Sequence, residues 1–199
     1  MLFLLISAGW AREGITRKIA ESSIPVKKSA EKLEKIASKK GITKARISGG
    51  EPTLCRDHLF ELLHHLEQSG ILNTSILKTN GILFGADSSY VEELRRSDLP
   101  YVRVSLKAGL PGKWEDKTGA ERGSFDLPYK AIKHLWRNDI DFHVAAMADP
   151  RITSKEETRE IYRKVAEISE VLAENIEWES IDMYPNTERR LKHAGIELE

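Results

Sequence analysis

Short apolar runs alternate with longer amphipathic stretches along the whole chain. The short runs are rich in aliphatic and β-branched residues, which is typical of buried strands, whereas the longer stretches repeat apolar residues every three or four positions, which is typical of helices. The predicted strands are residues 2–6, 45–48, 75–79, 101–106, 142–147 and 177–183. The predicted helices are residues 27–40, 57–69 and 127–138, two that begin near residues 89 and 154, and a short one that ends at Gly195. This order predicts βα units with parallel strands.

Local residue patterns mark where two of these helices begin. Ser89 with Glu92, and Ser154 with Glu157, have the spacing of a capping box, so we expect a helix to start directly after each serine. The helix after Ser154 is predicted to be long, because its apolar positions continue at helical spacing as far as Leu172.

The six βα units predict an α/β domain. Right-handed crossovers between parallel strands wind such units into a barrel or an open twisted sheet, and in both the loops after the strands form the working face. A chain of 199 residues suits one well-buried core, so we expect a single domain over residues 1–199. The glycine-rich stretch 108–123 is longer than a usual strand-to-helix connection, so we expect it to lie over a site, with Trp114 in contact with substrate.

Charge and cysteine content exclude several classes of protein. Lysine plus arginine and aspartate plus glutamate both number 31, so no overall field favours nucleic acid or an anionic membrane, and a small or neutral substrate fits better. Cys55 is the single cysteine, which excludes an internal disulfide and a zinc site built on two thiolates and indicates a cytoplasmic protein. We expect Cys55 to be a buried, inert thiol.

The apolar run 2–6 is too short to span a membrane and is expected to be a buried strand.

Three polar motifs follow the second, third and fourth predicted strands. They are Gly49-Gly50-Glu51-Pro52, Thr79-Asn80-Gly81 and Ser105-Leu106-Lys107. Because the carboxyl ends of parallel strands meet at one edge, these motifs are expected to converge on one rim. The two glycines expose backbone amides and carbonyls, and Pro52 fixes the turn that follows, so main-chain groups there can bind a ligand.

The first of these motifs carries a family resemblance. The run Ile47-Ser48-Gly49-Gly50-Glu51-Pro52-Thr53-Leu54 resembles the GGEP motif of radical S-adenosylmethionine enzymes, which that family also places at the end of a second strand. Similar stretches in archaeal and bacterial members match residues 78–81 and 102–107, Tyr184-Pro185 and Arg190-Leu191, and the resemblance begins at Trp10. It implies a partial (β/α)6 barrel of parallel strands with outer helices, in which S-adenosylmethionine lies across the open top.

The resemblance also implies which residues surround S-adenosylmethionine. The backbone of Gly49, Gly50 and Pro52, together with Glu51, would hold the methionyl amino group. The other implied pocket residues are Thr79 and Asn80 in the wall, Ser105 at the ribose, Met147 at the adenine, and Lys107 at the methionyl carboxylate or the substrate. A ligand with an ammonium, a carboxylate and a purine needs acceptors, a donor and an apolar slot, and these residue types supply them.

The resemblance fails over the first nine residues. Members of the family carry a CxxxCxxC motif after the first strand, where three thiolates hold a 4Fe-4S cluster, but residues 1–10 contain no cysteine. Trp10 marks where that motif would end, and Cys55 cannot replace it. The cluster, its electron donor and cleavage of S-adenosylmethionine to a 5′-deoxyadenosyl radical are therefore expected only in a full-length form with the cysteines.

Three explanations for the missing cysteines stay open: a late start codon or frameshift, a decaying gene, and conversion of the protein to a binder. The first predicts CxxxCxxC in the DNA upstream of Met1.

Three functions stay open. The first is a radical S-adenosylmethionine enzyme that is active in its full-length form, and the second is a module that binds S-adenosylmethionine without redox chemistry. The third is another β/α barrel enzyme that binds a phosphate at the Gly49-Gly50 loop. The expected substrate is a small molecule or a peptide, and no motif names it.

His64 and His65 are neighbours on a predicted helix, so they point to different faces and are expected to be surface residues rather than a metal pair.

Overall fold

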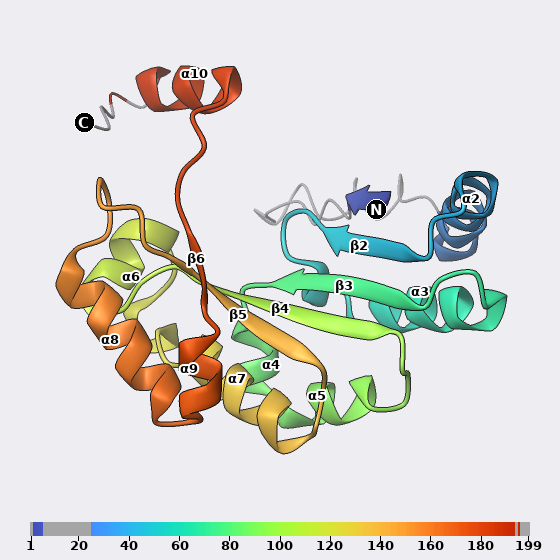
Figure 1. Ribbon diagram of the computed structural model, residues 1–199, viewed down its shortest axis with the longest axis horizontal. Helices are drawn as coiled ribbons and strands as arrows, with labels where there is room; N and C mark the ends of the chain where they lie inside the picture. Colours follow the sequence, from blue (N-terminus) through green and yellow to red (C-terminus); the bar gives the residue numbers. More distant parts are fainter. Residues whose placement is uncertain (1, 6–24, 194, 196–199) are drawn as a thin grey trace. The chain divides into compact units, whose positions relative to one another are not determined.

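The computed structural model of the chain describes the backbone of residues 2–5 and all atoms of residues 25–193 and 195 (Figure 1). The chain forms two compact units. The first unit is Met1–Val104 with Leu127–Phe142, and the second is Ser105–Asp126 with His143–Glu199. The single domain predicted over residues 1–199 stays a prediction. Trp10, where the family resemblance begins, lies outside the described residues.

Parallel strands form the sheet of the first unit. In order across the sheet they are β1 (Leu2–Leu5), β2 (Lys44–Ser48), β3 (Thr74–Thr79) and the first part of β4 (Pro100–Leu106). One side-chain face is fully buried, with 0% exposure at Ala45, Ile47, Leu77, Val102 and Val104. Because side chains alternate along a strand, the residues between them form the opposite face. We call it the polar face, and it carries Arg46, Lys78 and Arg103.

Helices supply the rest of the core of this unit. They are α2 (Val26–Lys40), α3 (Arg56–Ser69), α4 (Ile82–Ala86), α5 (Ser88–Leu94) and α7 (Leu127–Arg137), with the 3₁₀ turn η1 (Pro52–Leu54) after β2. In Figure 1, α4, α5 and α7 lie together on one side of β3 and β4. Helices α4 and α7 approach so closely that a Cβ at Gly85 would lie 1.9 Å from the carbonyl oxygen of Leu127, so only glycine fits there.

The second unit is built on two parallel strands, β5 (Phe142–Met147), from His143 onward, and β6 (Glu177–Glu179). Its helical segments are α6 (Pro111–Thr118), η2 (Arg122–Ser124), α8 (Lys155–Ala166), α9 (Glu170–Glu174) and α10 (Pro185–His193). Its core draws on α6, β5 and α8, with at most 3% exposure at Trp114, Phe125, Val144, Ile161 and Val165. None of the helices described in either unit is long and apolar enough to cross a membrane.

Most predicted elements lie within a few residues of their expected bounds, and the exceptions are at helix and strand ends. Ser154 and Glu157 form the predicted capping box of α8, with both reciprocal hydrogen bonds present. The helix ends earlier than predicted, at Ala166, and Leu172 belongs to the separate α9, because the backbone is extended at Ser169 between the two helices. Strand β6 also ends before its predicted limit at residue 183.

The start of α5 and the glycine-rich stretch differ from the predictions. Asp87 rather than Ser89 is the N-cap of α5, and its carboxylate accepts a hydrogen bond from the Ser89 amide at 2.9 Å. Asp87 also lies 3.0 Å from the Arg56 guanidinium, a long-range contact that favours this helix start. The stretch 108–123 is not an open loop, because it contains the helix α6, whose Trp114 side chain is buried.

Candidate functional site

The glycine pair after β2 adopts backbone angles that other residues avoid. Strand β2 ends at Ser48, and the φ angles of Gly49 and Gly50 are 107° and 53°, both in the left-handed region that favours glycine. Pro52 then begins η1 and is buried. We call residues 49–52 the glycine turn. It reverses the main chain at the carboxyl end of β2 and presents two successive peptide units that no Cβ covers.

The Glu51 carboxylate holds the glycine turn against the end of β3. Its Oε1 accepts hydrogen bonds from the Thr53 amide at 3.2 Å, the Thr53 hydroxyl at 2.7 Å and the Thr79 hydroxyl at 2.8 Å. Its Oε2 accepts one from the Asn80 amide at 2.7 Å. Hydrogen bonds to a charged acceptor are stronger than those between neutral groups, so this carboxylate links the ends of the two strands firmly.

Thr79 and Asn80 also shape the turn after β3. The Thr79 hydroxyl accepts a hydrogen bond from the Gly81 amide at 3.0 Å, and the Asn80 side-chain oxygen accepts one from the Ile82 amide at 2.9 Å, at the start of α4. The structure thus brings three predicted site residues, Glu51, Thr79 and Asn80, together at the carboxyl ends of β2 and β3. Protein groups already engage the Glu51 carboxylate, and its contact with a ligand ammonium stays a prediction.

The remaining predicted site residues belong to the second unit. Ser105 is partly exposed near the end of β4, and Met147 ends β5 in register with Glu179 of β6. The Lys107 ammonium lies 3.6 Å from the Glu179 carboxylate. Glu179 is not among the residues predicted from sequence, because the predicted strand continues to residue 183, whereas in the structure Glu179 is the last residue of β6. The ligand contacts of Ser105, Lys107 and Met147 stay predictions.

A buried carboxylate ties the segments after β5 and β6 together within the second unit. Asp149 is 1% exposed, and it accepts hydrogen bonds from Arg151 Nε and from the Ile181 amide, each at 2.8 Å. The Arg151 guanidinium, helped by the Ile181 amide, holds the pKa of Asp149 well below its usual range. Arg151 also donates to the Ile181 carbonyl at 2.8 Å. This link fixes the backbone just beyond the two strand ends that carry Met147 and Glu179.

Two expectations about single residues are wrong. Trp114 is 2% exposed, its indole donates a hydrogen bond to the Ser124 hydroxyl at 2.9 Å, and its ring lies 6.4 Å from that of Phe125, so it belongs to the core of the second unit. It is therefore not placed to touch substrate. Cys55 is exposed rather than buried, because it occupies the N-cap position of α3 at the surface.

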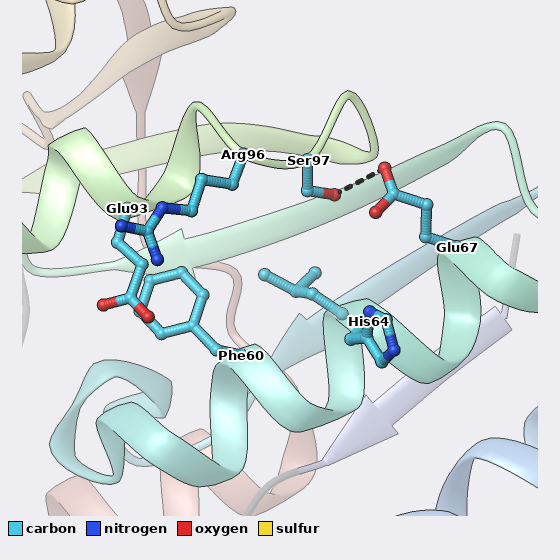
Figure 2. Close-up of a pocket in the computed structure, with 7 residues that line it drawn as sticks. Phe60, His64, Glu67, Glu93, Arg96 and Ser97 are labelled. Carbon is cyan, nitrogen blue, oxygen red and sulfur yellow. Dashed lines mark hydrogen bonds between the residues drawn. The ribbon is translucent and has the colours of Figure 1, made fainter.

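A cavity of about 220 Å³ lies among the helices of the first unit, apart from the strand ends (Figure 2). Its lining residues are Phe60, Leu63, His64, Glu67, Glu93, Arg96 and Ser97. Figure 2 shows the side chains of α3 facing the end of α5 and the turn after it, where the Ser97 hydroxyl donates to Glu67 at 2.9 Å. His64 is exposed as predicted and borders this cavity. No residue of the glycine turn does, so the cavity is a separate feature.

The chain does not provide the ligands of an iron–sulfur cluster. A 4Fe-4S cluster held in the manner of the resembled family needs three cysteine thiolates, and Cys55 is the only cysteine in the 199 residues. Among the residues with described positions, no group of three or more histidine, cysteine, aspartate or glutamate side chains is arranged to hold a metal ion. The residues present therefore do not fit this group.

Comparison with known proteins gives no matching family model but does give similar sequences and structures. The chain is 33% identical over 121 residues to a GTP 3′,8-cyclase of Petrotoga mobilis, which covers 61% of this chain and 35% of that protein. It is 29% identical over 158 residues to a probable GTP 3′,8-cyclase of Methanococcus vannielii, which covers 79% of this chain and 48% of that protein. The chain thus spans a third to a half of the length of these relatives.

A solved structure extends the likeness to the fold. Streptococcus suis SuiB, in a crystal structure with S-adenosylmethionine bound, has a TM-score of 0.59 and 20% sequence identity to this chain. The likeness covers 87% of this chain and 39% of the SuiB chain. It confirms the predicted fold class, an α/β fold of the partial-barrel type with parallel strands and outer helices.

Proposed function

This chain belongs to the radical S-adenosylmethionine superfamily, and we propose that its glycine turn binds the methionyl end of S-adenosylmethionine. The observation that carries the proposal is the engagement of Glu51, which fixes the turn against Thr79 and Asn80. The carboxylate is occupied in doing so, and we assign the ligand contacts to the main chain of Gly49, which is half-buried, and of Gly50, which is exposed. Backbone carbonyls in a fixed turn are suitable acceptors for an ammonium group. The ligand bound to SuiB, which shares this fold, supports the choice.

The second unit carries its own candidate ligand contacts, which we propose for S-adenosylmethionine. Ser105, at the end of β4, would donate a hydrogen bond to a ribose hydroxyl, and Met147, at the end of β5, would pack on the adenine. Lys107 would pair with the methionyl carboxylate or with substrate, exchanging its present neighbour Glu179 for the ligand. Each of these groups lies at or just beyond the carboxyl end of a strand, which is where ligands of parallel α/β folds bind.

We propose binding, and not cleavage, of S-adenosylmethionine as the function of the chain as written. Reductive cleavage in this superfamily depends on a 4Fe-4S cluster, and the single thiolate of Cys55 does not fit that group. The radical chemistry of a full-length form, together with its electron donor, stays a proposal that requires the cysteine motif.

The Ser105→Ala variant is expected to bind S-adenosylmethionine about fivefold more weakly than the parent chain, because one hydrogen bond to the ribose contributes about 1 kcal/mol. The matched control is His64→Ala, which changes the cavity between α3 and α5 and should leave the affinity unchanged. Calorimetric titration of the three proteins measures both effects. Equal affinity in Ser105→Ala, or a loss confined to His64→Ala, would contradict the assigned site.

The polar face of the first unit favours an anionic nucleotide as a second ligand. Lys78 and Arg103 are partners in the β3–β4 register, so their side chains lie on the same face of adjacent strands, and Arg46 of β2 lies on that face too. Lys78 and Arg46 are partly exposed, whereas Arg103 is buried. Adjacent cations suit the oxygens of a phosphate group. The relatives from Petrotoga mobilis and Methanococcus vannielii are named as cyclases of GTP. We therefore propose a nucleoside triphosphate as the substrate class of the full-length protein.

The Lys78→Met variant is expected to bind GTP about tenfold more weakly than the parent chain, because a charge-assisted contact to phosphate contributes more than a neutral one. Lys44→Met removes the same charge from the exposed first residue of β2 and should have no such effect. Competition with a fluorescent GTP analogue measures both affinities. Equal losses in the two variants would mean that only net charge matters, and the assigned substrate surface would be wrong.

A further inference from the structure

The glycine turn is held from a second side, by helix α5. Thr53, which directly follows the turn, is 0% exposed, and its carbonyl oxygen accepts a hydrogen bond from the Tyr90 hydroxyl at 2.8 Å. The amide and the hydroxyl of the same threonine donate to Glu51. Thr53 is thus fixed between the Glu51 carboxylate, which reaches β3, and a phenol from α5. The backbone position of the turn depends on both partners.

The Tyr90 ring itself has little freedom to move. It is 4% exposed, it packs edge-on against Phe84 with 4.9 Å between ring centroids, and it lies 5.5 Å from the ring of Phe60. Phe60 is visible in Figure 2 at the edge of the cavity between α3 and α5. Burial raises the pKa of the Tyr90 phenol, so the hydroxyl stays protonated and remains a donor at physiological pH.

Arg56 joins this ring to the chain that leaves the glycine turn. Its guanidinium carbon lies 4.8 Å from the centroid of the Tyr90 ring, as in a cation–π contact. Its Nε donates to Glu93 at 2.9 Å, and its other nitrogens donate to Asp87 at 3.0 Å and to the Ser89 carbonyl at 3.2 Å. Because Arg56 is the first residue of α3, these contacts fasten α5 to the segment that directly follows η1.

We propose that Tyr90 is a positioning residue for ligand binding: through the Thr53 carbonyl, its hydroxyl sets where the glycine turn presents its main-chain groups to the amino acid head of a ligand. The proposal rests on the proposed function of the turn. Tyr90 touches no ligand in this scheme, since it acts from the helix side of the turn. A phenol is suited to the task because its packed ring fixes the direction of one hydrogen bond.

The test is Tyr90→Phe, which keeps the ring among Phe84, Phe60 and Arg56 and removes only the hydrogen bond to Thr53. Two probes are titrated: S-adenosylmethionine, and 5′-methylthioadenosine, which has the same nucleoside but no amino acid head. The variant is expected to bind S-adenosylmethionine about fivefold more weakly, and to bind 5′-methylthioadenosine within about twofold of the parent chain. Tyr162→Phe, on the exposed surface of α8, is the control and should match the parent with both probes.

A selective loss of the probe with the amino acid head supports positioning, because general loosening of the fold would weaken both probes. Equal losses, or no loss with either probe, would overturn the proposal while leaving the site on the glycine turn intact. Failure of the parent chain to bind S-adenosylmethionine would instead remove the proposed function itself, and this proposal with it. Amide hydrogen exchange of residues 49–55 gives a second readout without ligand: faster exchange in Tyr90→Phe is expected, and unchanged exchange would overturn the link.

Discussion

The Glu51→Gln variant is expected to lose at least about tenfold in affinity for S-adenosylmethionine and about 2 kcal/mol in the free energy of unfolding. Glutamine has the shape of glutamate but offers one oxygen and one NH2 group. One carboxylate oxygen of Glu51 faces the Thr53 amide and the other faces the Asn80 amide. Either orientation of the glutamine amide therefore sets its NH2 group against a backbone N–H, and the link between β2 and β3 is broken on one side.

Calorimetric titration and urea unfolding of this variant measure the two losses. The matched control is Glu92→Gln, which makes the same chemical change at an exposed position of α5 in the same unit and should change neither quantity. A Glu51→Gln protein with the affinity and stability of the parent would show that the carboxylate does not organise the glycine turn.

The chain as written is expected to hold no stoichiometric 4Fe-4S cluster after anaerobic reconstitution with iron and sulfide. The cluster of this superfamily needs three thiolates, and Cys55 alone provides one, at the exposed start of α3. Iron and sulfide analysis, with the visible absorbance of the sample, measures the outcome. Cys55→Ser is the control, because iron that binds without a thiolate will be equal in both proteins. About four iron atoms per chain in the parent protein, and none in Cys55→Ser, would contradict this expectation.

Sequence patterns predict the fold well where the determining contacts are local. The bounds of β5 agree with the prediction from its continuous apolar run, and the start of α8 agrees because Ser154 and Glu157 are close in sequence and cap each other. The start of α5 is different. Ser89 and Asp87 are both good N-cap residues, and Asp87 is the one used. Its ion pair with Arg56 favours this choice, but Arg56 lies on α3, and the sequence pattern does not show that α3 and α5 are in contact.

The candidate site divides in the same way. The glycine turn is visible in the sequence because its residues are contiguous and its glycines have a backbone reason to be there. Thr79 and Asn80, which bind the Glu51 carboxylate, are predicted as site residues, but the hydrogen bond from Tyr90 to Thr53 is not visible, because the two residues are 37 positions apart. The link between Asp149 and Ile181 in the second unit, 32 positions apart, is not visible either. Single-sequence patterns carry no information on such pairs. The burial of Trp114 is not visible either, because it depends on the packing of its ring against Phe125 and on the hydrogen bond from its indole to Ser124.

Titration of S-adenosylmethionine into the purified parent chain, with no added iron, tests most directly whether this superfamily member keeps a ligand site on its glycine turn. Saturable binding at a single site is expected, together with its loss in Glu51→Gln and its retention in His64→Ala. The contrary result is a parent chain that does not bind S-adenosylmethionine, or binding that Glu51→Gln leaves intact and His64→Ala removes.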